Sequence, residues 1–365
     1  MKTLPFKLLL QGVIKSRFIT TGLLALTLLS HTIGFTETQT AQPNPVFTTH
    51  DLGNGVIAFI KPDPLRFNDA NITAIINKES VIIVDANSDL NAAEQIIAAI
   101  KSRTDKPVTH VINTHWHSDH TMANQLYQQA FAGKQIFVGH QSLTNTIVDK
   151  TQPQLDETIE NLAAAIKNAE DKLASDNNDD NTLAEKIARA KAKLEKLKTI
   201  NLVKPDKTFT NHLDLSTPDR RIELFNFGTA HTEGDTIVFL PDDKILIAGD
   251  LFDEIPFAGH GYPESWLATL NKIKALDFER VIPGHGSIHQ GKQQLEKIIT
   301  LLTKTLQQAS HAVNNKMTLE QFMSSINKDE FKQSLASKDE LAKRAYNHFI
   351  EDFYKQAYLS IKKDQ

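Results

Sequence analysis

The run of eight residues that decides how this chain is interpreted is Asn113–His120, which reads NTHWHSDH. Three histidines and one aspartate fall within six positions of one another. They directly follow the apolar, β-branched run Val108–Ile112, which predicts a strand. The 365-residue chain has no cysteine, and without cysteine the usual zinc donors are neutral imidazole and carboxylate. The run therefore predicts a metal site at the end of a strand.

The spacing inside this run suits two metal ions as well as one. His115 and His117 project to the same side of an extended backbone, because side chains alternate with a period of two. Asp119 and His120 come where a helix is expected to start, so the chain can turn them towards a second point. A single run can therefore supply donors to two ions.

Three further donors each follow an apolar, strand-like run. His231 lies in the loop Gly228–Asp235, Asp250 ends the run that begins at Ile247, and His285 ends the run that begins at Val281. Ligands placed on a rigid sheet edge are expected at such positions. Each of the three alone would suit a turn, but together with the first run they predict one shared site.

These residues resemble the metallo-β-lactamase-fold superfamily of metal-dependent hydrolases. The defining motif, His-x-His-x-Asp-His, is present without substitution between His115 and His120, and the later donors occur in the family's order. The match covers about residues 47–290. The resemblance implies an αββα sandwich with the metals at one edge, and the alternation of strand-like and helix-like runs after residue 50 independently predicts a layered α/β protein with mixed sheets.

The resemblance also implies a ligand set for two zinc ions per chain. Asp250 would bridge both ions, and Asp85 would support the ligand loop from behind. Iron or manganese also suits the same donors. The ligands of the first ion would be His115, His117 and His231, and those of the second would be Asp119, His120 and His285.

Hydrolysis is the chemistry expected of such a site. A metal-bound hydroxide would attack a carbonyl-type substrate such as an ester, lactone, thioester or lactam, with Asp119 as the residue that orients it and takes or returns its proton. Asp250 stands where the β-lactamases of the family usually carry Cys or Ser. This difference disfavours β-lactam hydrolysis, which is kept as an alternative. The donors also suit a persulfide dioxygenase-like oxidoreductase with mononuclear iron, or a metal-stabilised binding protein. His117, where flavodiiron oxidoreductases place an acid, favours hydrolysis over oxygen reduction.

Substrate contacts are expected from the loops around the donors. The loop Asp253–Tyr262 follows Asp250 directly and contains aromatic residues and glycine. The candidates are Trp116, His140, His260 and Tyr262.

We expect the hydrolase domain to cover residues 47–290 and to contain a helical-hairpin insertion at 151–200. A helical extension is expected at 291–365. Apolar residues recur at heptad spacing on both sides of a polar turn within the insertion, from Leu155 to Leu173 and from Leu183 to Leu197. This pattern predicts two helices that fold back antiparallel, to serve as packing, as a substrate lid, or as the contact of a homodimer.

Residues 1–41 predict an export signal. Basic residues precede the apolar run Phe18–Leu29, which is too short to span a bilayer comfortably. A secreted or periplasmic protein without an integral membrane domain is expected, with an uncleaved membrane anchor as the alternative. The remainder holds 36 basic and 43 acidic residues, a net charge of −7 that gives no electrostatic footprint for nucleic acid. The expected partner is a small-molecule substrate, as the hydrolytic site implies.

Overall fold

The computed structural model describes residues 46–175 and 181–363, which fall into two compact units. Within these ranges, one unit holds the helices between Gln152 and Ile200, and the other comprises residues 46–151 and 201–363. The signal predicted at residues 1–41 lies outside the described residues. None of the helices within the described ranges combines the length and the apolar composition needed to cross a bilayer.

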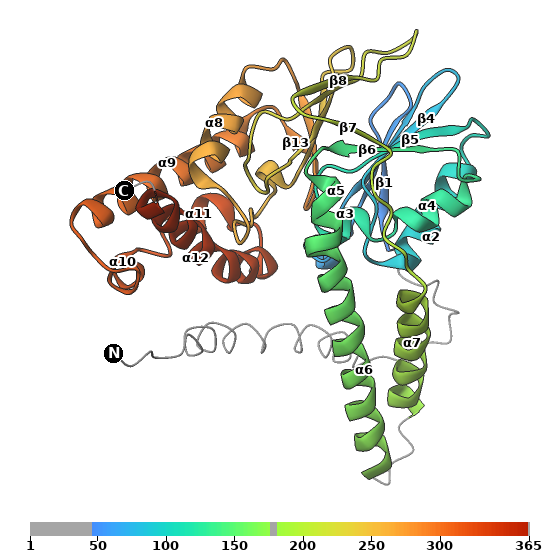
Figure 1. The fold of residues 1–365 in the computed structure, drawn as a ribbon, viewed down its shortest axis with the longest axis horizontal. Coiled ribbons are helices and arrows are strands. Elements are labelled where there is room, and N and C mark those ends of the chain that lie inside the picture. Colours follow the sequence, from blue (N-terminus) through green and yellow to red (C-terminus); the bar gives the residue numbers. More distant parts are fainter. Residues whose placement is uncertain (1–45, 176–180, 364–365) are drawn as a thin grey trace, which may run out of the picture. The chain divides into compact units, whose positions relative to one another are not determined.

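The larger unit contains a mixed, seven-stranded sheet whose strands follow one another in chain order (Figure 1). The first four strands pair antiparallel, whereas β4 to β7 pair parallel. The strands are β1 (Thr48–Asp51), β2 (Val56–Ile60), β3 (Ile72–Ile76), β4 (Val81–Val84), β5 (Val108–Ile112), β6 (Ile136–His140) and β7 (Lys207–Phe209).

A second, six-stranded sheet has the order β13-β12-β11-β10-β9-β8. Its one parallel pair joins β11 and β12, and this pairing brings the carboxyl ends of the two strands to the same edge. The strands are β8 (His212–Asp214), β9 (Glu223–Phe225), β10 (Ile237–Leu240), β11 (Ile245–Gly249), β12 (Arg280–Pro283) and β13 (His289–Gln290).

The two sheets share a buried apolar layer. Ile82 and Ile112 of the first sheet pack in one cluster with Val238 and Ile247 of the second. Strand β10 is buried on both faces, because Val238 faces the first sheet while Phe239 faces helices. This double burial explains why β10 reads as a continuous apolar run instead of an alternating one.

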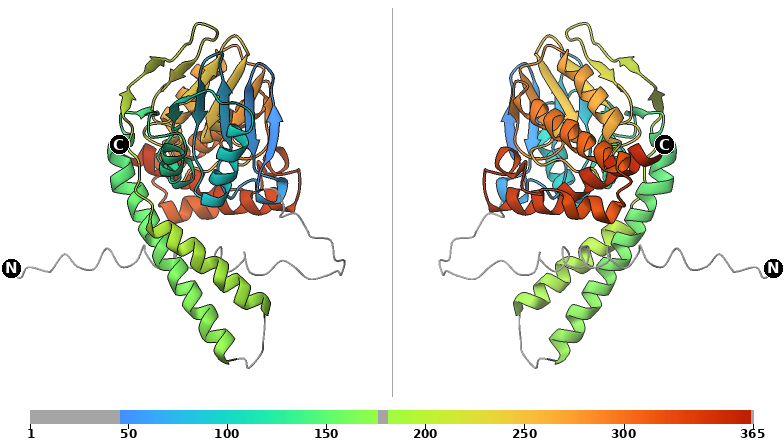
Figure 2. Two further views of the ribbon diagram at one scale, coloured as in Figure 1. Left: turned by 90° about the vertical axis from the view of Figure 1, so that its right-hand side faces the viewer. Right: turned by 90° about the vertical axis from the view of Figure 1, so that its left-hand side faces the viewer.

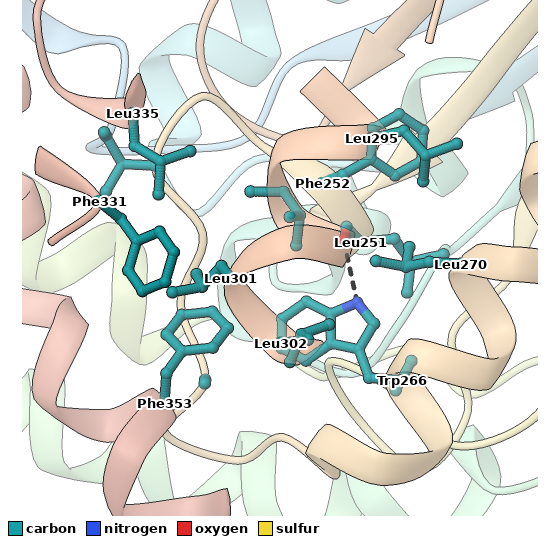
Figure 3. Packing of buried hydrophobic residues seen from close by; sticks show 14 of the residues in the cluster. Leu251, Phe252, Trp266, Leu270, Leu295, Leu301, Leu302, Phe331, Leu335 and Phe353 are labelled. Atoms are coloured by element: carbon teal, nitrogen blue, oxygen red, sulfur yellow. Dashed lines mark hydrogen bonds between the residues drawn. The ribbon is translucent and has the colours of Figure 1, made fainter. Parts of the chain in front are cut away.

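Helices cover the outer face of each sheet, which confirms the αββα sandwich. Helices α2 and α4 contact each other beside the seven-stranded sheet (Figure 1), and α8, α9 and α12 pack on the six-stranded sheet through the cluster that contains Trp266, Leu302 and Phe353 (Figures 2 and 3). The helices of this unit are α2 (Leu90–Lys101), α3 (Ser118–Thr121), α4 (Asn124–Ala130), α5 (Leu143–Thr146), α8 (Pro263–Lys274), α9 (Gln293–Asn314), α10 (Leu319–Ser325), α11 (Lys332–Leu335) and α12 (Glu340–Lys363).

The helix expected to start at Asp119 and His120 is broken into α3 and α4. The backbone N–H of Ala123 donates to the carbonyl oxygen of Asn87, at 2.9 Å, instead of to a carbonyl of the preceding turn. Next to this break the side chains of Asn113 and Asn124 form two hydrogen bonds with each other. These bonds therefore hold the chain just after the NTHWHSDH run against the start of the run, beside the end of β5.

The smaller unit is the predicted helical hairpin. Helix α6 (Gln152–Ser175) and helix α7 (Asn181–Lys198) run antiparallel (Figure 1). Ile166, Ile187 and Leu194 form its buried apolar seam, as the heptad spacing predicted.

Candidate metal centre

The NTHWHSDH run is held in place by Asp85, at the end of the neighbouring strand β4. The Asp85 carboxylate accepts hydrogen bonds from the backbone N–H of Thr114 at 2.7 Å and from its hydroxyl at 2.8 Å. Its Oδ2 also accepts from Nδ1 of His120 at 2.9 Å. Asp85 adopts a left-handed backbone (φ 65°), a conformation in which Asp and Asn are over-represented. The carboxylate thus fixes both the backbone of the run and one of its imidazole rings.

The structure brings the first predicted ligand group together. Donor atoms of His115, His117, His231 and Asp250 all lie within 4.8 Å of one another, and all four residues are buried. Nε2 of His231 is 3.1 Å from Nδ1 of His117 and 3.4 Å from Oδ2 of Asp250. This arrangement suits a single ion bound mainly by nitrogen.

The second predicted group lies beside the first. Donor atoms of Asp119, His120 and His285 also lie within 4.8 Å of one another. Asp250 contacts this group too, because its carboxylate oxygens are 3.1 Å from Nε2 of His120 and 3.5 Å from Nε2 of His285. Asp250 therefore lies between both groups, where a bridging ligand is expected.

Two glycines allow the backbone to pass close to the Asp250 carboxylate and to Thr114. A Cβ atom on Gly284 would lie 1.9 Å from Oδ1 of Asp250, so any side chain at position 284 would displace the carboxylate. Gly249, the residue before Asp250, has a φ of 53° and passes against Thr114. Only glycine adopts that conformation at this distance without strain.

The donor set fits metal ions. Nε2 of His115 is buried and forms no hydrogen bond with any described residue, although buried polar atoms normally have a partner. Burial also lowers the pKa of His115 and of His117 well below the usual value for histidine, which favours the neutral imidazole that a metal ligand requires.

The second group concentrates negative charge. Burial alone would lower the pKa of His120 and of His285. The charge of Asp250 instead raises both pKa values well above the usual value for histidine. Burial alone would raise the pKa of Asp119, but the charge on His120 and the hydrogen bond from His285 lower it instead. The carboxylates therefore attract positive charge, as protons or as metal ions.

Several residues that the sequence did not single out support the His285 turn and the His231 loop. Asn71 donates from its amide to the carbonyl oxygens of Pro283 and Gly286, both at 3.0 Å, so it clamps the turn on both sides of His285. Asp235 accepts from the backbone and hydroxyl of Thr232, the residue after His231. Contacts that involve backbone atoms leave little signature in a sequence, although an aspartate four residues after His231 was one available signal.

The four candidate substrate contacts divide into two pairs. His260 lies at the donors, with its Nδ1 2.9 Å from Nε2 of His117. The buried Trp116 packs edge-on against the His117 ring and donates from Nε1 to Glu233 at 3.1 Å. Tyr262 is 41% exposed, and His140 forms a hydrogen bond with Ser142. Within the described ranges, neither His140 nor His260 belongs to a group of His, Cys, Asp and Glu donors that could hold a metal.

The chain is similar to one protein family and to a curated member of known activity. A model of the metallo-β-lactamase superfamily matches residues 65–141 and 158–285. A linear primary-alkylsulfatase from Pseudomonas sp. (strain ATCC 19151) is 20% identical over 287 residues, covering 76% of this chain and 51% of the relative. The chain thus spans about half the length of this curated relative.

Two solved structures share the fold. A metallo-β-lactamase from Pontibacter korlensis superposes with a TM-score of 0.50 at 16% identity, covering 70% of this chain and 99% of that one. The stereoselective inverting sec-alkylsulfatase Pisa1 from Pseudomonas sp. gives a TM-score of 0.59 at 13% identity, covering 86% of this chain and 50% of that one. At such identities the likeness concerns the fold alone.

Proposed function

The chain belongs to the metallo-β-lactamase superfamily of metal-dependent hydrolases, and we propose that it is a dinuclear, zinc-dependent hydrolase of small carbonyl-type esters. The observation that carries the proposal is the position of Asp250 between two groups of donors, within 3.6 Å of His115 and His231 on one side and of His120 and His285 on the other. One carboxylate in contact with both groups suits two neighbouring ions that act together.

Each side chain has a distinct task in this proposal. Bound metal ions would act as Lewis acids and lower the pKa of bound water to about 7. Asp119 is the most exposed donor, with 23% of its side chain accessible, whereas the His285 side chain is 13% and that of Asp250 7% accessible. Substrate and attacking water would therefore enter beside Asp119, whose low pKa keeps the carboxylate ionised to orient the water.

The side chains around the donors favour a neutral acyl group. Lys150 lies over the ring of Trp116 at 4.8 Å, but it is paired with Glu233 at 2.6 Å. Lys61 is likewise buried against Asp69 at 3.1 Å. Because these cations are already neutralised, a carboxylate on the substrate would gain little from them. The proposal therefore places esters, lactones and thioesters before β-lactams.

A second candidate is hydrolysis of alkyl sulfate esters. The similarity to the linear primary-alkylsulfatase, across 76% of this chain, supports this candidate. A sulfate ester presents an electrophilic centre with several oxygens, which two metal ions can hold and polarise as they would a carbonyl.

A substrate panel tests both candidates. The zinc-loaded full chain is given a p-nitrophenyl carboxyl ester, a lactone, a thioester, a linear primary alkyl sulfate and a chromogenic cephalosporin, and bound metal is measured by elemental analysis. About two zinc equivalents with fastest turnover of a carbonyl ester support the proposal. Fastest release of sulfate identifies the second candidate, and fastest opening of the cephalosporin identifies a β-lactamase. One iron equivalent with oxygen consumption on a persulfide, or metal without turnover, would refute hydrolysis.

We further propose that the protein is exported and that the hairpin α6–α7 has an assembly or lid role. Both proposals rest on the sequence patterns of residues 1–41 and 151–200. Cell fractionation and the mass of the mature chain test export. Deleting 151–200 separates the two roles of the hairpin: full turnover with a smaller assembly indicates a dimer contact, and lost turnover with retained metal indicates a lid.

A further inference from the structure

The loop Asp253–Tyr262 contacts two ligand rings that belong to other segments of the chain. The carbonyl oxygen of Phe257 accepts a hydrogen bond from Nδ1 of His231 at 2.9 Å. Nδ1 of His260 lies 2.9 Å from Nε2 of His117. The loop therefore contacts the far side of two imidazole rings whose opposite nitrogens, Nε2 of His231 and Nδ1 of His117, are 3.1 Å apart.

These contacts select the nitrogen that each ring presents to the metal. A carbonyl oxygen only accepts, so Nδ1 of His231 carries the proton and Nε2 keeps the lone pair. If His117 donates from Nε2 to His260, its Nδ1 keeps the lone pair in the same way. Partners of this kind, behind metal-ligating histidines, typically contribute about 10–100-fold to metal affinity or activity.

The loop is in turn held by two glutamines from the C-terminal helices. Nε2 of Gln356, on α12, donates to the carbonyl oxygen of Gly259 at 2.9 Å. Nε2 of Gln294, on α9, donates to the carbonyl oxygen of Asp253 at 2.6 Å. One amide thus holds the start of the loop, and the other holds it between Phe257 and His260.

Packing anchors the same segment to the same helices. Leu251 and Phe252, the two residues after Asp250, are each 1% exposed within the cluster that Trp266 and Phe353 share (Figure 3). Nε1 of Trp266 donates to the carbonyl oxygen of Leu251 at 3.0 Å. The C-terminal helices therefore form the support on which this side of the metal centre rests.

We propose that Gln356 is a positioning residue of the metal centre, which holds the Gly259 carbonyl so that Phe257 and His260 orient the rings of His231 and His117. The inference rests on the proposed dinuclear site. It gives the helical extension a role in metal binding, beyond packing on the sheet.

The test compares three substitutions of Gln356 in the full chain. Gln356→Met removes the donor with little change of shape, Gln356→Glu places a carboxylate against the Gly259 carbonyl, and Gln356→Lys keeps an N–H donor. Zinc affinity is measured by competition with a chromogenic chelator, and ligand geometry by the visible spectrum of the cobalt-substituted protein. Loss of one hydrogen bond predicts roughly a fivefold lower zinc affinity for Gln356→Met and an altered cobalt spectrum, with a larger loss for Gln356→Glu and near wild-type values for Gln356→Lys.

Gln308→Met is the matched control. Gln308 lies on α9 and donates to Glu330 at 3.0 Å, so the same substitution removes a hydrogen bond of the extension that does not reach the loop. Its zinc affinity and cobalt spectrum should match the wild type even if its melting temperature falls. Equal zinc affinity and identical spectra in Gln356→Met and the wild type would overturn the inference alone. A wild-type chain that binds no zinc would overturn the proposed function together with it.

Discussion

Oδ2 of Asp85 lies 2.9 Å from Nδ1 of His120, and it joins the end of one strand to the ring of a ligand that follows the next strand. Among the residues that the structure describes, Asp85 belongs to no group of metal donors. Its carboxylate holds the His120 ring so that Nε2 faces Asp250, at 3.1 Å.

Asp85→Asn tests this relationship. Asparagine tolerates the left-handed backbone at position 85, but its amide is a weaker acceptor for an imidazole N–H than a carboxylate is. Zinc affinity should fall about 10–100-fold, the usual effect of removing such a partner. Isothermal titration with zinc measures it, and Asp214→Asn on an exposed strand serves as the control. Unchanged affinity would show that the Asp85 charge is dispensable.

His117→Ala removes a donor of the first group while leaving the second group intact. We expect bound zinc to fall from about two equivalents towards one, and turnover to fall by more than the roughly 100-fold that outer partners cost. Elemental analysis and steady-state kinetics measure the two effects. Two equivalents with wild-type turnover would exclude His117 as a ligand. His311→Ala, at the end of α9 opposite to Gln294, should change neither quantity.

Gly284→Ala tests the close approach to Asp250. The new methyl group would lie 1.9 Å from Oδ1 of Asp250 and must displace the carboxylate. Overpacking of this kind costs about 1–3 kcal/mol, which corresponds to about 5–150-fold weaker metal binding. Gly133→Ala is the control, since Gly133 has a φ of 64° with no described atom within 4 Å of the added Cβ. The control should lose some stability and keep its metals; equal metal binding in both variants would contradict the expectation.

Asp339→Asn tests a contact between the start of α12 and the loop before β3. The hydrogen bond from Arg66 lowers the pKa of Asp339 to about 2, below its usual 3.8. A depressed carboxyl pKa stabilises the fold above pH 4, and this stabilisation is lost as the pH falls towards 2. Asparagine keeps the helix cap to Ala342 but loses the charge. Chemical denaturation should therefore show a deficit for the variant at pH 6 that shrinks between pH 4 and pH 2; a constant deficit would rule out the charge as its cause.

The sequence allowed prediction of those parts of the site whose chemistry resides in side chains. Histidines and aspartates at strand ends stand out, so the donors from His115 to His285 could be predicted to share one site, and the family resemblance supplied their division between two ions. Strands that are buried on both faces of their sheet were also predictable from side chains, because double burial makes runs such as Ile237–Leu240 apolar throughout.

Other features depend on partners that no local pattern reveals. The helix that starts near Asp119 is broken because the backbone N–H of Ala123 donates to the carbonyl oxygen of Asn87, far away in the sequence. The short strands β7 and β8 are largely polar and exposed, so they resemble loops. The roles of Asn71 and Gln356 rest on backbone carbonyls of other segments, and a carbonyl looks the same at every position.

The position of Asp250 also has a consequence for the order of folding. Its carboxylate meets rings that come from residues 115 to 285, and those rings converge only after both sheets have formed and stacked. Pairings between such distant segments are slow to form, so metal uptake should be a late event in folding. Once the ions are bound, they favour the folded chain by mass action. The metal content of a preparation would therefore report how much of it has completed folding.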